Sequence, residues 1–128
     1  MSNPDRQANI QELKDLIKKF CEERGWQERQ TPRSLASSIS IEAGELLEHF
    51  QWDDYQGENK QAVADELADV LFYCFNFANV TDIDITTAFK DKLEKASQKY
   101  PLKSFQGGDG NMEEYFKIKN EYRGKKTP

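Results

Sequence analysis

Apolar residues recur at helical spacing through most of the chain, and this pattern predicts four helices. The predicted helices cover residues 4–24, 32–50, 60–79 and 85–99. Asn3-Pro4 and Thr31-Pro32 match the cap-then-proline signature of a helix start, and Gly25 suits a helix end. No segment alternates cleanly between apolar and polar residues as a strand would. The pattern therefore predicts an all-α fold that resembles a four-helix bundle.

After Pro101 the chain changes in character. The stretch "GGDGN" at residues 107–111 predicts a flexible turn, followed by a short helix at residues 112–122 and a mobile basic end. We therefore divide the chain into a helical domain, residues 1–104, and a short, partly flexible C-terminal extension, residues 105–128.

Composition narrows the class of protein. The 128 residues fit one domain with a modest core, and the net charge of -5 argues against binding a nucleic-acid polymer. No apolar run approaches the ~20 residues of a membrane span, and the N-terminus lacks the apolar core of a signal peptide. Cys21 and Cys74 have no zinc or redox spacing and are expected to be buried thiols. We expect a cytoplasmic protein that does not enter membranes.

Two pairs of acids lie within the helical pattern. Glu42 and Glu45 are three residues apart, so they share a helix face, and Glu66 and Asp69 repeat the arrangement on the next predicted helix. If these helices pack antiparallel, the carboxylates converge, and four unpaired anions would repel one another and lose hydration. A hard divalent cation such as Mg²⁺ would neutralise them. The alternative is that all four are ordinary solvated acids.

Other chemistries fit less well. Carboxylate-bridged di-iron bundles need two Glu-x-x-His motifs, whereas His49 is the only histidine and follows Glu45 by four residues. His49 is expected at the surface or at a helix end. No nucleophile motif and no phosphate-binding glycine loop occurs. Gly44, between the first two acids, costs a helix about 1 kcal/mol relative to alanine. We hypothesise that it lets the facing helix or a ligand's phosphates come close.

Three blocks of the sequence resemble a known family. "TPRSLASSISIEAGELLEHFQW", "DELADVLFYCF" and "KLEKASQKYP" resemble the MazG-like nucleotide pyrophosphohydrolases of the all-α NTP pyrophosphatase superfamily, nearest to the dCTP pyrophosphatase branch. The resemblance spans about residues 10–102. It implies Mg²⁺-dependent hydrolysis of a (deoxy)nucleoside triphosphate, dCTP-like, to the monophosphate and pyrophosphate. The residues that match the metal-binding and catalytic acids are Glu42, Glu45, Glu66 and Asp69.

The resemblance also implies substrate-binding residues and self-association. Trp26 and Trp52 match aromatics that flank the base, Tyr73 and Lys92 match residues near the phosphates, and Gln30 can hydrogen-bond the substrate. The alternatives are that the tryptophans are core or interface anchors and that the lysine is solvated. Family members form homo-oligomers, so a dimer or tetramer is expected.

The sequence departs from the family pattern at two places. Arg29-Gln30 stand where Phe-His is frequent, and Ala96 stands where asparagine is usual. These departures put the nucleotide preference in doubt. Two alternative functions therefore stay open. The protein could be a catalytically weak nucleotide-binding or regulatory helical protein, or a plain helical oligomer without a ligand.

Overall fold

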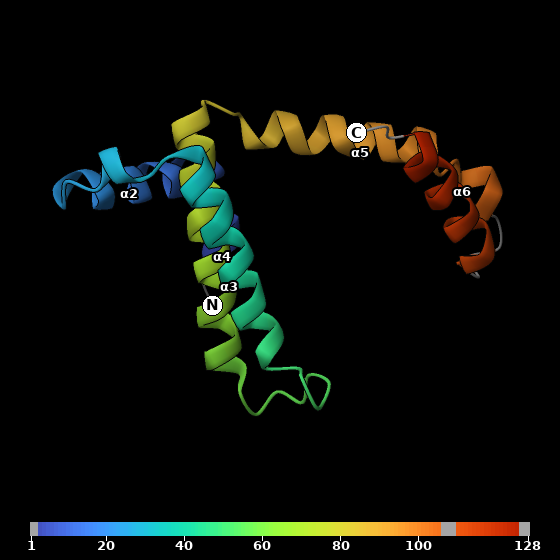
Figure 1. Cartoon of the computed structure of the whole chain (residues 1–128), viewed down its shortest axis with the longest axis horizontal. Helices are drawn as coiled ribbons and strands as arrows, with labels where there is room; N and C mark the ends of the chain where they lie inside the picture. Colours follow the sequence, from blue (N-terminus) through green and yellow to red (C-terminus); the bar gives the residue numbers. More distant parts are fainter. Residues whose placement is uncertain (1–2, 106–109, 126–128) are drawn as a thin grey trace. The chain divides into compact units, whose positions relative to one another are not determined.

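The computed structural model describes residues 3–105 and 110–125, and within these residues it contains helices and no strand (Figure 1). The prediction of an all-α fold is therefore confirmed. In chain order the elements are α1 (Pro4–Gln7), α2 (Ile10–Glu23), the short 3₁₀ helix η1 (Gln27–Arg29), α3 (Pro32–Glu48), α4 (Lys60–Thr81), α5 (Ile85–Lys99), the 3₁₀ helix η2 (Leu102–Phe105) and α6 (Met112–Lys125).

Helix starts follow the capping signals in the sequence. The side chains of Asn3 and Thr31 each accept a hydrogen bond from a backbone amide in the first turn of α1 and α3. The prediction of one continuous helix over residues 4–24 is wrong. Ala8 and Asn9 adopt extended backbone, and the Asn9 side chain accepts a hydrogen bond from the Glu12 amide at 2.9 Å. Asn9 thus starts a second helix by the same mechanism that Asn3 uses for the first.

The chain forms two compact units, Met1–Ile85 and Thr86–Pro128, and each is described by itself. In the first unit, α2 and α3 both pack on α4, and α3 runs beside α4 in the opposite direction (Figure 1). The apolar side chains that are buried are Leu35, Cys21 and Ala78, at 1%, 2% and 3% exposure. Burial there fixes α3 against α4, and this packing sets the geometry of the site.

The second unit is held together by aromatic contacts. The rings of Tyr100, just after α5, and Tyr115, on α6, stack at 5.2 Å with an angle of 20° between their planes. The short helix predicted at residues 112–122 is confirmed and continues to Lys125. Most of the turn predicted at residues 107–111, and residues 126–128 of the predicted basic end, lie outside the described residues.

Large apolar side chains of the first unit are also exposed. Leucine and isoleucine side chains that are more than two-fifths exposed include Leu16, Ile41, Leu47, Leu67 and Leu71. A helical unit with so many uncovered apolar side chains has surface that association could bury. Among the described residues, no helix is both long enough and apolar enough to cross a membrane.

Candidate active site

The packing of α3 on α4 brings the two acid pairs together. One ligand oxygen from each of Glu42, Glu45, Glu66 and Asp69 lies within 4.8 Å of the others. Glu42, Glu45 and Glu66 are half-buried and Asp69 is exposed, so the cluster opens to solvent on the Asp69 side. The convergence expected from the spacing of three and the antiparallel packing is therefore present.

The cluster raises the pKa of two of its acids. A hydrogen bond with Glu45, together with burial and the negative charges of its neighbours, raises the pKa of Glu42 to about 7. Burial, followed by the charge of Glu45, raises the pKa of Glu66. In addition, Glu42 Oε2 and Glu66 Oε2 are buried and have no hydrogen-bond partner within the described residues. Such oxygens need a proton, a cation or an incoming donor.

These residues fit a hard divalent cation. All the converging atoms are carboxylate oxygens, which is the donor type that Mg²⁺ prefers. Oxygens on opposite sides of a Mg²⁺ ion lie about 4.2 Å apart, since each bond is about 2.1 Å. The 4.8 Å spread of the four ligand atoms is only slightly larger. Small rotations of the carboxylates would close that difference, and the ion would offset their mutual repulsion.

His49 is a neighbour of this cluster that the sequence did not reveal. It stands at the C-terminal end of α3, as expected, but it is half-buried rather than on the surface. Its Nε2 lies 3.9 Å from Glu66 Oε1, and its Nδ1 lies 3.4 Å from the Asn59 side-chain nitrogen. One feature of the sequence could have predicted this position. His49 follows Glu45 by four residues, which is one turn along the same helix face.

Tyr73 lies beside the acids, where the sequence analysis expects a residue that contacts phosphates. Burial, and then the negative charges of Glu42 and Asp69, raises the pKa of its phenol. Tyr73 follows Asp69 by four residues on α4, so the two side chains share a face. A protonated phenol at this position can donate a hydrogen bond to an anion held at the cluster.

Trp26 and Gln30 belong to the connection between α2 and α3. The Trp26 ring meets Phe20 edge-on at 5.6 Å and is 42% exposed. Gln30 Oε1 accepts a hydrogen bond of 2.6 Å from Asn76 Nδ2, which ties this connection to α4. Trp26 is therefore anchored to α2, and Gln30 is anchored to α4, one of the two helices that carry the acids.

The other two predicted binding residues lie outside the two helices that carry the acids. Trp52 follows α3 and is 86% exposed. Lys92 belongs to the second unit, where it lines a cavity of about 330 Å³ together with Lys95, Lys99 and Tyr122. Their roles stay predictions.

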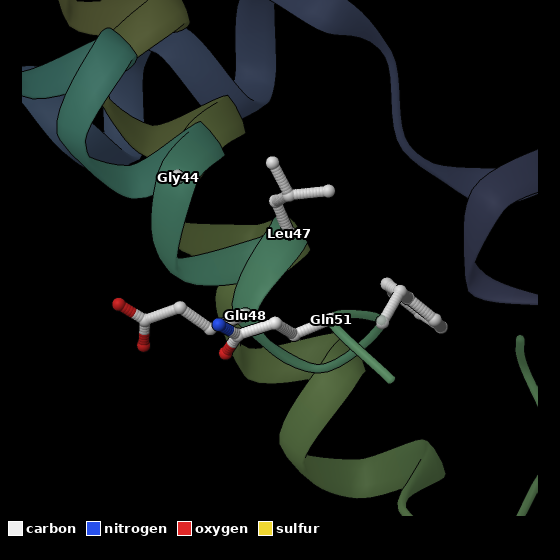
Figure 2. A pocket seen from close by; sticks show the side chains of 5 residues that line it. Gly44, Leu47, Glu48 and Gln51 are labelled. Carbon is white, nitrogen blue, oxygen red and sulfur yellow. The ribbon is translucent and has the colours of Figure 1, made fainter. Parts of the chain in front are cut away.

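Gly44 faces open space. A Cβ atom at this position would meet no atom of the described residues within 4 Å, so the idea that Gly44 lets a facing helix approach is wrong for this chain. Figure 2 shows Gly44 on α3 beside a pocket of about 760 Å³, whose lining includes Leu47, Glu48 and Gln51. The other part of the hypothesis, that Gly44 lets a ligand's phosphates come close, stays a prediction.

The structure is that of an all-α protein with four converging carboxylates that could hold a metal ion, and comparison with known proteins identifies its family. A sequence model of the MazG-like family matches residues 37–115, well over half of the chain. The chain therefore belongs to the MazG-like family.

Its relatives include mammalian proteins and a solved archaeal structure. The chain is 30% identical over 104 residues to dCTP pyrophosphatase 1 of Rattus norvegicus and 28% identical over 103 residues to that of Homo sapiens. These matches cover 75% and 74% of this chain, and the chain spans 61% of the length of either relative. The crystal structure of a pyrophosphatase from Archaeoglobus fulgidus superposes with a TM-score of 0.66 at 42% identity, covering 72% of this chain and 92% of that one.

Proposed function

We propose that this protein is a Mg²⁺-dependent nucleoside triphosphate pyrophosphohydrolase that acts on a dCTP-like nucleotide and helps to remove unwanted nucleotides. The observation that carries the proposal is the convergence of four carboxylates within 4.8 Å in a MazG-like chain. The mammalian and archaeal relatives are both named as pyrophosphatases, which supports the hydrolysis reaction.

The four acids would hold the metal. Mg²⁺ bound there supplies positive charge that offsets the charge of the phosphates and makes a water molecule more acidic. The cluster is exposed at Asp69, and this open side would admit the phosphates to an ion held by the four acids. Water attacks a phosphorus of the α–β bridge, the bridging bond breaks, and pyrophosphate and the monophosphate leave. A carboxylate of the cluster accepts the proton of the water.

The nucleotide would be bound outside the metal cluster. Tyr73 donates to the phosphates, and Lys92 supplies a positive charge for them. Trp26 and Trp52 offer flat faces for the base, and Gln30 offers hydrogen bonds. We assign these roles to the helical domain, residues 1–104, and leave the extension at residues 105–128 outside the chemistry.

Self-association is part of the proposal. The exposed apolar side chains of α3 and α4, among them Ile41, Leu47 and Leu67, support at least a dimer, and a tetramer would bury more of them. The two cysteines are free, which fits the reducing cytoplasm. The net charge of -5 supports a small nucleotide, rather than a nucleic-acid polymer, as the ligand.

The test is pyrophosphate release from a panel of ribo- and deoxyribonucleoside triphosphates, with Mg²⁺ or with EDTA. We expect release only with Mg²⁺, and a loss of at least a hundredfold in Glu45→Gln and in Asp69→Asn. The matched control is Asp65→Asn, an exposed carboxylate on α4 that hydrogen-bonds Gln61 rather than the cluster. Full activity in both cluster variants would show that the site is elsewhere.

A second candidate is a nucleotide-binding or regulatory protein with little turnover. The departures at Gln30 and Ala96 favour it, because neither residue matches the family pattern at positions that hold the substrate. Nucleotide binding without release from any triphosphate would establish this alternative.

A further inference from the structure

Three polar side chains form a series that ends at the acid cluster. His49 stands at the C-terminal end of α3, and Asn59 and Glu66 belong to the start and the second turn of α4. Asn59 Nδ2 lies 3.4 Å from His49 Nδ1, and His49 Nε2 lies 3.9 Å from Glu66 Oε1. Asn59 and Glu66 are seven residues apart, so they share nearly the same face of α4 at a separation of about 10 Å along its axis. The imidazole of His49 bridges this separation.

Asn59 does not use its side chain to cap its own helix. It is the N-cap residue of α4, a position where asparagine usually accepts a hydrogen bond from an amide of the first turn. Asn3, Asn9 and Thr31 make such a bond at the starts of α1, α2 and α3, whereas the side chain of Asn59 makes none. The amide of Asn59 is half-buried and meets the imidazole of His49 instead.

The contact with Asn59 determines where the imidazole holds its proton. The amide nitrogen of Asn59 is a donor, so the Nδ1 atom that it meets is an acceptor and carries no proton. A neutral imidazole whose Nδ1 is bare carries its proton on Nε2. A charged imidazolium would place an N–H group at Nδ1 against the donor amide. His49 therefore presents an Nε2–H donor on the side where Glu66 lies.

The two oxygens of the Glu66 carboxylate have different surroundings. Oε1 faces His49 Nε2 at 3.9 Å, about 1 Å longer than a hydrogen bond, and a small rotation of either side chain closes this gap. Oε2 is buried and has no hydrogen-bond partner within the described residues. A donor that occupies Oε1 leaves Oε2 for a cation. His49 is absent from the set of described side chains whose ligand atoms converge within 4.8 Å, so it is the neighbour of a ligand and not itself a ligand.

We propose that His49 is a positioning residue for the metal site: its Nε2–H group orients the Glu66 carboxylate so that Oε2 is directed at the ion, and Asn59 holds the imidazole in the tautomer that this requires. Hydrogen bonds of this kind fix a ligand before the metal arrives, and the loss of such a partner costs about 10- to 100-fold in metal affinity. The proposal rests on the proposed function only in that the four acids hold a divalent cation.

The first test compares two substitutions of His49 by isothermal titration calorimetry with Mg²⁺ at pH 8. Leucine has a bulk similar to that of histidine but no donor, whereas glutamine carries an amide N–H at about the reach of Nε2. We expect His49→Leu to bind Mg²⁺ about tenfold more weakly and His49→Gln to stay within about threefold of the wild type. Gln56→Leu, an exposed residue of the same connection between α3 and α4, is the matched control and should bind as the wild type does.

The second test reads the tautomer directly. His49 is the only histidine, so ¹⁵N NMR of the imidazole reports on this side chain alone. The metal-free protein at pH 8 should carry the proton on Nε2, and Mg²⁺ should move the Nε2–H proton signal downfield as the bond to Glu66 shortens. Asn59→Ala should admit the Nδ1–H tautomer and weaken Mg²⁺ binding part of the way toward His49→Leu, and Gln56→Leu should do neither.

Several results would overturn the proposal. These are an unchanged affinity in His49→Leu, equal losses in His49→Leu and His49→Gln, and a wild-type proton on Nδ1. A melting temperature of His49→Leu in EDTA well below that of the wild type would also overturn it, because His49 would then act through packing. An unchanged tautomer in Asn59→Ala would overturn the role of Asn59.

Failure of this proposal can be told apart from failure of the proposed function. If the wild type binds no Mg²⁺ in calorimetry, the metal site and the role of His49 fail together. If Mg²⁺ binding responds to the His49 variants as expected but no triphosphate releases pyrophosphate, the proposed hydrolysis fails and the role of His49 stands.

Discussion

The affinity for Mg²⁺ should depend on pH because one of the proposed ligands, Glu42, holds a proton near neutrality. The pKa of Glu42 in the metal-free protein is raised to about 7. An ion that needs the ionised carboxylate must displace this proton. Roughly nine-tenths of Glu42 is ionised at pH 8 and roughly one-tenth at pH 6, so lowering the pH between these values should weaken the apparent affinity about tenfold. The raised pKa of Glu66 acts in the same direction.

The assay is isothermal titration calorimetry of the metal-free protein with Mg²⁺ at pH 6, 7 and 8. Titrations at pH 7 in buffers of different ionisation enthalpy should reveal about half a proton released from Glu42 for each ion bound. Glu42→Gln should bind more weakly and lose most of the pH dependence, and Asp65→Asn should behave as the wild type. Equal affinity at pH 6 and pH 8, or the full pH dependence in Glu42→Gln, would refute the reasoning.

Three further predictions concern stability and assembly. Because folding raises the pKa of Glu42 from 4.5 to about 7, its contribution to stability is present below pH 4.5 and is lost as the pH rises through 7. In calorimetry, the EDTA-treated protein should therefore melt at a lower temperature at pH 8 than at pH 5. Mg²⁺ should raise the melting temperature more at pH 8 than at pH 5. A metal-free protein that melts at a higher temperature at pH 8 than at pH 5 would contradict this prediction. Leu35→Ala, at a side chain only 1% exposed, should lower the free energy of unfolding by about 2–5 kcal/mol in urea titrations. Leu16→Ala, on α2 at 64% exposure, should lower it by less than half as much, and an equal loss would argue against the packing described. Sedimentation at micromolar concentration should give a dimer or larger species, and a monomer would refute self-association.

The helix starts and the acid cluster could be predicted because they depend on local rules. Capping residues precede α1 and α3 in the sequence, and a spacing of three residues places each acid pair on one face. The convergence of the pairs needed one further assumption, that α3 and α4 pack antiparallel, and the structure has this arrangement (Figure 1).

The errors and omissions have physical causes. The break at Asn9 was missed because Asn3-Pro4 already matches a helix start, so a second start six residues later was not expected. The Asn9 side chain caps α2 and competes locally with a continuous helix. The contacts of His49 with Glu66 and of Asn76 with Gln30 join separate elements, so they depend on how the helices pack and turn. No spacing within one element predicts which side chain a neighbouring element will present.

The most direct test of the central claim is to identify the products formed from dCTP and Mg²⁺ by ³¹P NMR. The four-carboxylate site in a MazG-like chain predicts dCMP and pyrophosphate in equal amounts, with none formed by Asp69→Asn. Products of dCDP and inorganic phosphate, or equal product formation by Asp69→Asn, would contradict it.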